Sequence, residues 1–397
     1  MVTTTVRPSP LPMALGVNYA AMMALAIAVN LLPVFYTTLA GEWRLSHEQL
    51  GRIGAVTFIG LVAGILLTGP LADRFGARRF AILGNALIAG GLAVLAKAPN
   101  YSALLVAVAV MGFGAGVLDM VLSPIVCAFQ PDRRTTAMNW LHSFYCVGAV
   151  VTVLVAVQAL RGGVAWRTIA LWLILLPAAV TTGFLVLHIP PLIPEGARLR
   201  TRELFARPIF LLALVAIFFA GATELGMAQW LPTYTEQNLG FAKWVGGMSL
   251  LAFSVAMTLG RMIAGALGDR LKPVPLMLGC CAASAALFLA ACFVPHPPLA
   301  LAASIAVGFT GSCLWPSLLG VTADRYPQGG ATMFGLLGAS GNAGGIVIPW
   351  LVGVIADAAS LPLGLATTTL CPILMAVALF WMTRPRTGSS DAYRMAE

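Results

Sequence analysis

Two acidic side chains stand inside long apolar stretches of this sequence. Asp119 lies in the stretch 101–128 and Glu224 in the stretch 208–233, and of the fourteen acidic residues only these two fall well inside such a stretch. A lone carboxylate in lipid costs at least about 2.5–3.5 kcal/mol on insertion scales, which makes it a functional candidate by default. Burial away from water favours the neutral form of a carboxyl group. We therefore expect Asp119 and Glu224 to take up and release protons.

Basic residues are absent from the central part of these stretches. The nearest exception is Arg261, close to one end of the stretch 244–268. We therefore predict that the two acids are unpaired and do not form a buried salt bridge. A neutral acid hydrogen-bonded to a neighbouring helix, worth around 0.6 kcal/mol, remains an alternative. Arginine and lysine are the usual ligands of anions, so the pattern favours a neutral or cationic substrate.

Polar and aromatic side chains inside the apolar stretches could bind such a substrate. A sugar is held by hydrogen bonds to its hydroxyl groups and by an aromatic face against its ring. Trp230 has an alternative place in the aromatic belt at the membrane surface, and His142 is either a proton relay or a helix contact. We predict as substrate-binding residues Asn30, Asn139, Tyr145, Gln229, Trp230 and Asn342.

The elements that must position these residues are membrane-spanning helices. Hydrophobic residues make up 59% of the chain and charged residues only 9%, against roughly 25% charged in a soluble domain. About twelve apolar stretches are each long enough to cross a hydrocarbon core of about 30 Å. We predict an all-α membrane protein with twelve transmembrane helices at 13–37, 50–70, 80–97, 101–128, 138–160, 166–189, 208–233, 244–268, 274–294, 297–320, 331–356 and 361–382.

The distribution of basic residues predicts the orientation. Of the 23 Lys and Arg residues, about seventeen fall in loops on the side of both termini and six on the other side. Cytoplasmic loops carry the excess of Lys and Arg, so we place both termini in the cytoplasm of a bacterial-type inner membrane. The net charge of +9 is scattered over short loops and forms no nucleic-acid-binding stripe.

The chain contains an internal repeat. The sequence GPLADR at 69–74 recurs as GALGDR at 265–270, 196 residues later, and Gly112-Phe113 recurs as Gly308-Phe309 at the same offset. Two halves with a site between them near the bilayer midplane are what alternating access requires. We predict a six-helix half at 1–190, a cytoplasmic linker at 191–207, a second half at 208–383 and a tail at 384–397.

The loop between the second and third stretches resembles the hallmark loop of the major facilitator superfamily. It reads Gly69-Pro-Leu-Ala-Asp73-Arg74-Phe-Gly76-Ala-Arg78-Arg79. The resemblance implies the major facilitator fold and a latch at one face of the transporter. In such a latch Asp73 caps backbone donors and pairs with an arginine, while Gly69 and Gly76 permit close helix approach. The other residues that we assign to it are Arg74, Arg78, Asp269 and Arg270; the alternative is that these charges only fix topology.

A narrower resemblance is to the sugar-transporting branch around fucose and glucose permeases. It rests on Gly112-Phe-Gly114 with Asp119 and Ser123-Pro124, on 138–149, on Gly221-Ala-Thr-Glu224 with Trp230-Leu-Pro232-Thr-Tyr234, and on Ile348-Pro349. This chain has Ser123 where that branch often has asparagine, and it has Asn30 near the place of an acidic residue of the fucose type. The identity of the substrate therefore cannot be carried over.

These observations predict a secondary active transporter that couples protons to symport of a sugar or another small neutral polar solute. The alternative is proton-driven efflux of a hydrophobic or cationic drug-like compound, which Met22 and Met23 could help to accommodate. A membrane enzyme would need a nucleophile with a base, or a metal cluster, and the four histidines are dispersed. We expect no enzyme activity, cofactor, metal or nucleic acid; the expected partners are the solute, protons and the lipid bilayer, and we expect a monomer.

Overall fold

The protein is described by a computed structural model over residues 9–45, 47–192, 199–268 and 270–384. In this part of the chain twelve helical segments are long and apolar enough to cross a membrane, which confirms the predicted number. The first half contains α1 (Leu11–Trp43), α2 (His47–Phe75), α3 (Ala77–Ala96), α4 (Tyr101–Phe129), α5 (Arg134–Arg161) and a sixth segment made of α6 (Trp166–Leu173) and α7 (Leu175–Val186).

The second half follows the short helix α8 (Thr201–Phe205). Its seventh segment runs through α9 (Pro208–Ala228), α10 (Leu231–Thr233) and a π-helical turn, η1 (Tyr234–Asn238). The remaining segments are α11 (Lys243–Leu267), α12 (Pro273–Phe293), α13 (Pro297–Gly311) with α14 (Leu314–Arg325), α15 (Gly330–Ala358), and α16 (Leu361–Thr367) with α17 (Leu370–Thr383). Part of the predicted linker, 193–198, and the predicted tail from 385 onward lie outside the described residues.

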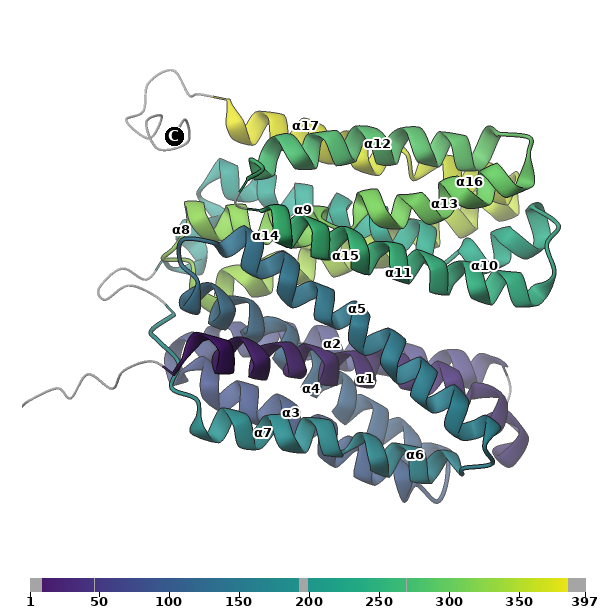
Figure 1. Cartoon of the computed structure of the whole chain (residues 1–397), viewed down its shortest axis with the longest axis horizontal. Coiled ribbons are helices and arrows are strands. Elements are labelled where there is room, and N and C mark those ends of the chain that lie inside the picture. The colour runs from purple at the N-terminus through teal and green to yellow at the C-terminus, as the bar shows by residue number, and fades with distance from the viewer. Residues whose placement is uncertain (1–8, 46, 193–198, 269, 385–397) are drawn as a thin grey trace, which may run out of the picture.

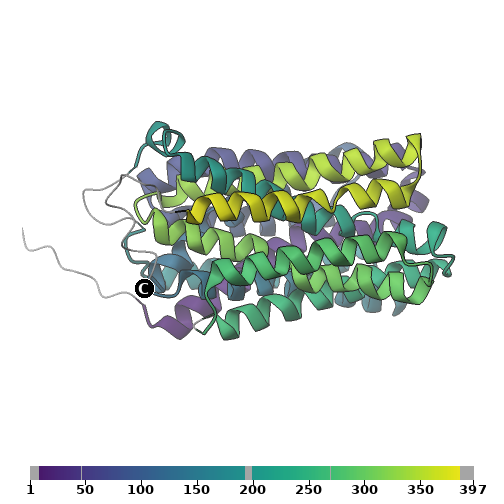
Figure 2. The same cartoon turned by 90° about the horizontal axis from the view of Figure 1, so that it is seen from above.

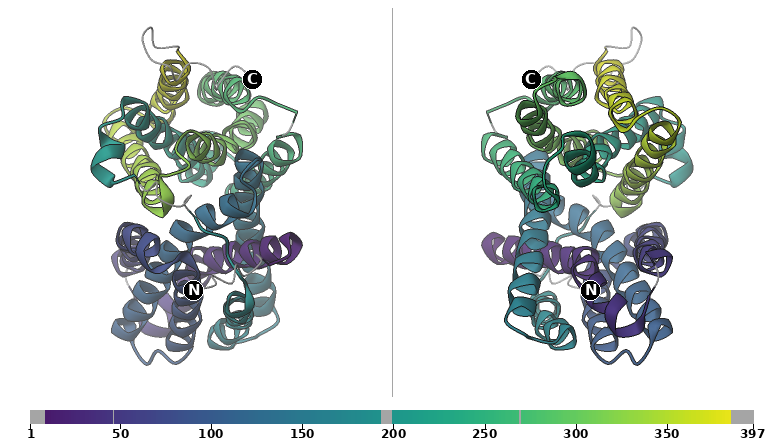
Figure 3. Two further views of the ribbon diagram at one scale, coloured as in Figure 1. Left: turned by 90° about the vertical axis from the view of Figure 1, so that its left-hand side faces the viewer. Right: turned by 90° about the vertical axis from the view of Figure 1, so that its right-hand side faces the viewer.

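The helices form two bundles that lie side by side, one made of α1–α7 and the other of α9–α17 (Figures 1 and 3). Seen from above, the helices run along the long axis of the molecule (Figure 2). The start of α1 and the end of α17 lie at the same end (Figure 1), as an even number of spans requires. Because Arg74, Arg78, Arg134 and Arg325 lie at helix termini there, we call it the basic end.

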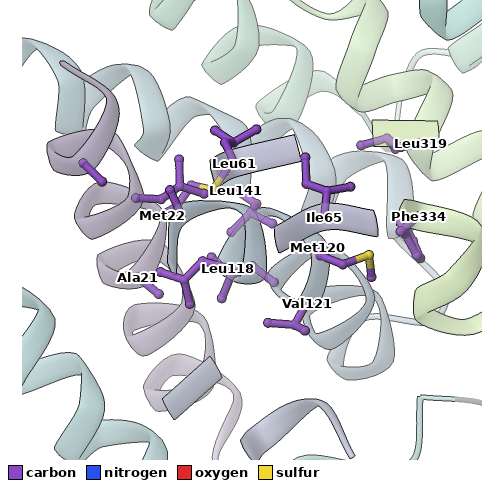
Figure 4. Close-up of a cluster of buried hydrophobic side chains, with 14 of the residues drawn as sticks. Ala21, Met22, Leu61, Ile65, Leu118, Met120, Val121, Leu141, Leu319 and Phe334 are labelled. Atoms are coloured by element: carbon purple, nitrogen blue, oxygen red, sulfur yellow. The ribbon is translucent and has the colours of Figure 1, made fainter. Parts of the chain in front are cut away.

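The two bundles meet along α2 with α15 and along α5 with α11 and α14. Figure 1 shows α5 crossing obliquely beside α11 and α14. At the interface Leu319 and Phe334 of the second half face Ile65 and Met120 of the first half (Figure 4). This part of the contact is therefore apolar, and the polar groups described below lie elsewhere along the same interface.

Small residues bring the helices within each bundle close together. A Cβ atom added at Gly116 of α4 would overlap the carbonyl oxygen of Leu61 in α2, and one added at Gly344 of α15 would overlap that of Phe218 in α9. Close backbone approach through small residues is how helices associate in lipid, where van der Waals packing and interhelical hydrogen bonds replace the hydrophobic effect. These glycines therefore set how closely α4, which carries Asp119, approaches α2, and how closely α9, which carries Glu224, approaches α15.

We predict that Gly116→Ala destabilises the protein by about 1–3 kcal/mol, because overpacking forces the backbones of α2 and α4 apart. Gly90→Ala in α3 is the matched control, since nothing lies within 4 Å of a Cβ atom added there. Thermal unfolding in detergent, followed by intrinsic fluorescence, measures both variants. Equal midpoints for the two variants would contradict the packing described here.

Candidate functional site

A small cavity lies between the two halves and is bordered by Asp119. Its volume is about 10 Å³, room for roughly one water molecule. α4 contributes Asp119 and Ser123, one turn apart on the same helix. The full lining is Ile65, Asp119, Met120, Ser123, His142, Trp315, Leu319, Phe334 and Gly338. Because these residues come from both halves, any relative movement of the halves changes the surroundings of the Asp119 carboxylate.

Two polar groups at this cavity lack hydrogen-bond partners in the described part of the chain. The structure gives the Asp119 carboxylate no hydrogen bond or ion pair there. Its neighbour across the cavity is Gly338 of α15, where an added Cβ atom would lie 4.0 Å from Oδ2 of Asp119. The Nε2 atom of His142 is buried and is also unpaired. Buried polar groups are normally satisfied, so the half-buried Asp119 carboxylate and the buried Nε2 atom of His142 are both open to a proton, a water molecule or a solute hydroxyl. The unpaired state predicted for Asp119 agrees with this geometry.

Glu224, the second intramembrane acid, differs from Asp119 because it is paired with a basic residue. Glu224 of α9 accepts a hydrogen bond at 2.6 Å from Nη2 of Arg261 in α11, and the two side chains are 16% and 3% exposed. The prediction that Glu224 is unpaired is therefore wrong. Arg261 lies six residues before the end of α11, about 9 Å by the helical rise, and its side chain is buried.

The rest of the guanidinium group is held by neutral acceptors from both halves. Nε donates to the carbonyl oxygen of Ser312 at 3.0 Å, and Nη1 donates to the carbonyl oxygen of His142 at 3.2 Å and to Sγ of Cys146 at 3.1 Å. Ser312 lies between α13 and α14, and its carbonyl has no helical partner because residue 316 is a proline without an N–H. A fixed positive charge therefore sits at the interface, which removes the premise from which a neutral or cationic substrate was predicted.

The residues predicted to bind substrate are divided over several places. Asn30 of α1 and Tyr145 of α5 are brought together, with Nδ2 of Asn30 donating to the tyrosine hydroxyl at 3.4 Å. Asn139 is buried in the contact between the halves, where it donates to Oγ of Ser317 at 2.9 Å. Only the first pair thus remains available as a joint polar contact for a solute.

The other predicted binding residues belong to the second half. Trp230 is half-buried and donates from Nε1 to the carbonyl oxygen of Pro349 at 2.9 Å, so it packs on α15. Asn342 is half-buried and donates to the carbonyl oxygen of Gly338 at 2.9 Å. Gln229 is exposed just after α9. These three side chains do not surround one point.

Asp73 connects the halves at the basic end. Its Oδ1 accepts from the backbone N–H of Ala331 at 2.6 Å, and its Oδ2 accepts from the N–H and hydroxyl of Thr332 at 3.0 and 2.5 Å. The first turn of α15, which begins at Gly330, has free N–H donors and a partial positive charge. A carboxylate of the first half thus caps a helix of the second half, as the latch interpretation predicts for this residue.

The remaining latch residues have different surroundings. A Cβ atom on Gly69 would lie 3.3 Å from Cα of Thr332, so Gly69 allows α2 to approach α15. Gly76 meets nothing within 4 Å and has a φ of +88°; its predicted role in close approach is wrong, and it instead permits a left-handed turn between α2 and α3. Arg78 donates to the carbonyl oxygens of Phe184 and Leu185 within the first half.

Three further residues complete the predicted latch. Arg74 lies over the ring of Phe75, 5.2 Å from its centroid. Arg270 is exposed, and Asp269 lies outside the described residues. A second link between the halves, which the sequence did not suggest, joins Nη1 of Arg134 to Oδ1 of Asp324 at 3.2 Å. Like the Asp73 contacts, it lies at the basic end.

We predict that Asp73→Ala opens the basic end, because hydrogen bonds to a charged group contribute about 1.5–3 kcal/mol. Cys127 reports the opening, since it is buried and lines a cavity of about 240 Å³ at that end. Its labelling by a water-soluble maleimide, followed by peptide mass spectrometry, is expected to become at least about tenfold faster. Asp132→Ala, an exposed acid at the same end, is the control, and unchanged labelling of Cys127 in Asp73→Ala would argue against a latch.

Comparison with known proteins agrees with this architecture. The family model of the Major Facilitator Superfamily matches residues 18–253 and 246–395. The chain is 28% identical over 364 residues to the "Putative niacin/nicotinamide transporter NiaP" of Bacillus subtilis, covering 86% of this chain and 88% of that protein. It is 27% identical over 343 residues to the gentisate transporter of Corynebacterium glutamicum, covering 80% and 75%.

Among solved structures, the chain is similar to the fucose:proton symporter FucP of E. coli. The TM-score is 0.78 at 19% identity, with 96% of this chain and 100% of that chain covered. In the residues that the structure describes, no cluster of three His, Cys, Asp or Glu side chains is placed to hold a metal ion. The family match over nearly the whole chain, the twelve spans and the shared fold establish that the protein belongs to the Major Facilitator Superfamily and is a membrane transporter, not an enzyme.

Proposed function

We propose that this transporter is a proton-coupled symporter of a small polar solute and that Asp119 carries the proton. The observation that supports the proposal most directly is the position of the Asp119 carboxylate, which borders a cavity between the halves without a hydrogen-bond or ion-pair partner in the described residues. An unpaired carboxylate in a membrane interior is stabilised by protonation. A change in the contact between the halves alters that environment and with it the retention of the proton.

Alternating access is supported by the arrangement of the contacts between the halves. The Asp73 contacts and the Arg134–Asp324 ion pair lie at the basic end. The side chain of Phe334 lines both the cavity beside Asp119 and the larger cavity at the basic end. Phe334 is therefore a candidate gate, and its movement would join the two cavities. We further propose that the basic end faces the cytoplasm of an inner membrane and that the protein acts as a monomer.

The hydrogen-bonding groups between the helices support a polar solute. Hydroxyl groups of a sugar could replace the contact between Asn30 and Tyr145, which is long at 3.4 Å, and the similar fold of a fucose:proton symporter is compatible with a sugar. The name of one relative mentions niacin and nicotinamide, and that of another mentions gentisate. Niacin and gentisate are small aromatic acids, whereas nicotinamide is a neutral amide. We propose a small polar solute that offers hydrogen-bonding groups.

We predict that Asp119→Asn abolishes coupling. In proteoliposomes that contain a trapped pH dye, addition of a transported solute should acidify the lumen for the unchanged protein. In Asp119→Asn, acidification should fall at least about tenfold while exchange of labelled for unlabelled solute continues, because asparagine keeps the shape of the side chain but cannot carry a proton.

Asp357→Asn is the matched control, because Asp357 is exposed near the opposite end of α15. The solutes to be tested are neutral sugars, small carboxylates and cationic drugs, each added outside. Normal coupling in Asp119→Asn would contradict the role of this residue. A response to cationic drugs alone would favour efflux over symport.

A further inference from the structure

The ion pair between Arg261 and Glu224 has no part in the role proposed for Asp119. We propose that Arg261 is a binding site for the carboxylate of a small organic acid, and that Glu224 occupies this site until it is protonated. The inference rests on the proposed function, since it assumes a solute that moves together with protons. It adds the chemical class of the solute and a second protonation event.

The hydrogen bonds of Arg261 place its positive charge at the contact between the two halves. Arg261 is held by Ser312 of the second half and by His142 and Cys146 of the first half. These three acceptors are neutral, so they fix the guanidinium group but do not compensate its charge. Only Nη2 points to an anion, which is Glu224. Replacement of this one partner would leave the rest of the arrangement intact.

Exposure distinguishes the two members of the pair. Arg261 is 3% exposed and Glu224 is 16% exposed, so the carboxylate is the member that solvent reaches more readily. A guanidinium group stays protonated in proteins, whereas a carboxylate can be neutralised. If Glu224 takes up a proton, Arg261 is left as a buried cation without a counterion, a state that costs several kcal/mol.

A second carboxylate removes that cost. The planar guanidinium group matches a carboxylate in geometry and charge. The proton count balances: Glu224 gains one proton and becomes neutral, and one solute carboxylate takes its place beside Arg261. The net charge of the site is zero before and after. A neutral sugar cannot compensate Arg261 in this way, so one proton and one monocarboxylate would enter together.

The other groups around Glu224 do not provide an alternative counterion. From α5, Cys146 shares the guanidinium group of Arg261 with Glu224, and Tyr145 precedes Cys146; both side chains are neutral when protonated. α13, α16 and α17 carry no charged side chain, although α17 contains the thiol Cys371 and Cys313 precedes α14. The charged residues of α14 and α15 lie at helix ends, namely Asp324, Arg325 and Asp357.

Polar groups near the pair could hold the remainder of the solute. Tyr145 precedes Cys146 on α5, and its hydroxyl accepts from Nδ2 of Asn30. A solute whose carboxylate meets Arg261 could thus place a hydroxyl group or an aromatic ring against Asn30 and Tyr145. A solute with a carboxylate at one end and a hydroxyl group or aromatic ring at the other is a small hydroxylated or aromatic monocarboxylate.

The test uses the full-length purified protein in nanodiscs with pairs of probes that differ chiefly in the carboxylate. Nicotinate is compared with nicotinamide, and gluconate with glucose, by tryptophan fluorescence at pH 5.5 and 7.5. We expect binding of at least one acid and none of its neutral counterpart. The affinity should rise as pH falls, by up to about tenfold per pH unit when one proton is taken up on binding.

Two variants test the role of the pair. Glu224→Gln imitates the protonated acid, so it should bind the acid at pH 7.5 as tightly as the unchanged protein does at pH 5.5, with no remaining pH dependence. Glu224→Gln combined with Arg261→Gln removes both charges, which avoids a buried unpaired ion, and should lose at least about a hundredfold in affinity while keeping its thermal midpoint. Glu236→Gln, in the π-helical turn of the same segment, is the matched control.

Several results would overturn the inference: neutral probes that bind as well as the acids, pH-dependent binding in Glu224→Gln, or binding by the double variant. Its failure is distinguishable from that of the proposed function. A sugar that moves protons through Asp119 but does not require Arg261 would refute the carboxylate site and leave symport standing. An acid that binds through Arg261 but moves no protons would refute symport and support the site.

Discussion

A charge inside a membrane needs a partner, and this constraint organises the interface between the two halves. Arg261 cannot lose its proton, so the surrounding helices supply four acceptors, including a carbonyl oxygen of Ser312 that is free because Pro316 offers no N–H. Removal of any one acceptor would leave a buried donor unsatisfied. The residue that carries the charge therefore also contributes to the contact between α5 and the second half.

At the basic end, the groups that need a partner are backbone N–H donors. The first N–H groups of α15 have no partner within their own helix, and the Asp73 carboxylate of the other half satisfies them. Separation of the halves exposes both groups, which water can then solvate. Closure at this end is thus an exchange of water for protein contacts with a small net free energy, which is what a transporter that must open and close repeatedly requires.

The sequence was sufficient for the spans but not for the lateral contacts. Each span is a local property of about 20 residues, so hydropathy located all twelve to within a few residues, with η1 extending the seventh beyond 233. The partner of Glu224 depends on how α9 and α11 are rotated about their axes, and the two residues are 37 positions apart. Hydropathy contains no such information. The packing of Trp230 on α15 could not be predicted for the same reason. The positive φ of Gly76 is a property of the local backbone, about which hydropathy is equally silent.

The two intramembrane acids have different surroundings, and this difference constrains how the transporter can use them. Asp119 can gain a proton without leaving a charge behind, because nothing in the described structure is paired with it. Glu224 cannot, because its neutralisation uncovers Arg261. In the proposed mechanism, protonation of Asp119 is governed by access to water, whereas protonation of Glu224 is governed by the arrival of another anion. A transporter that contains both acids can make the movement of a proton conditional on the solute through Glu224 and conditional on the conformation through Asp119.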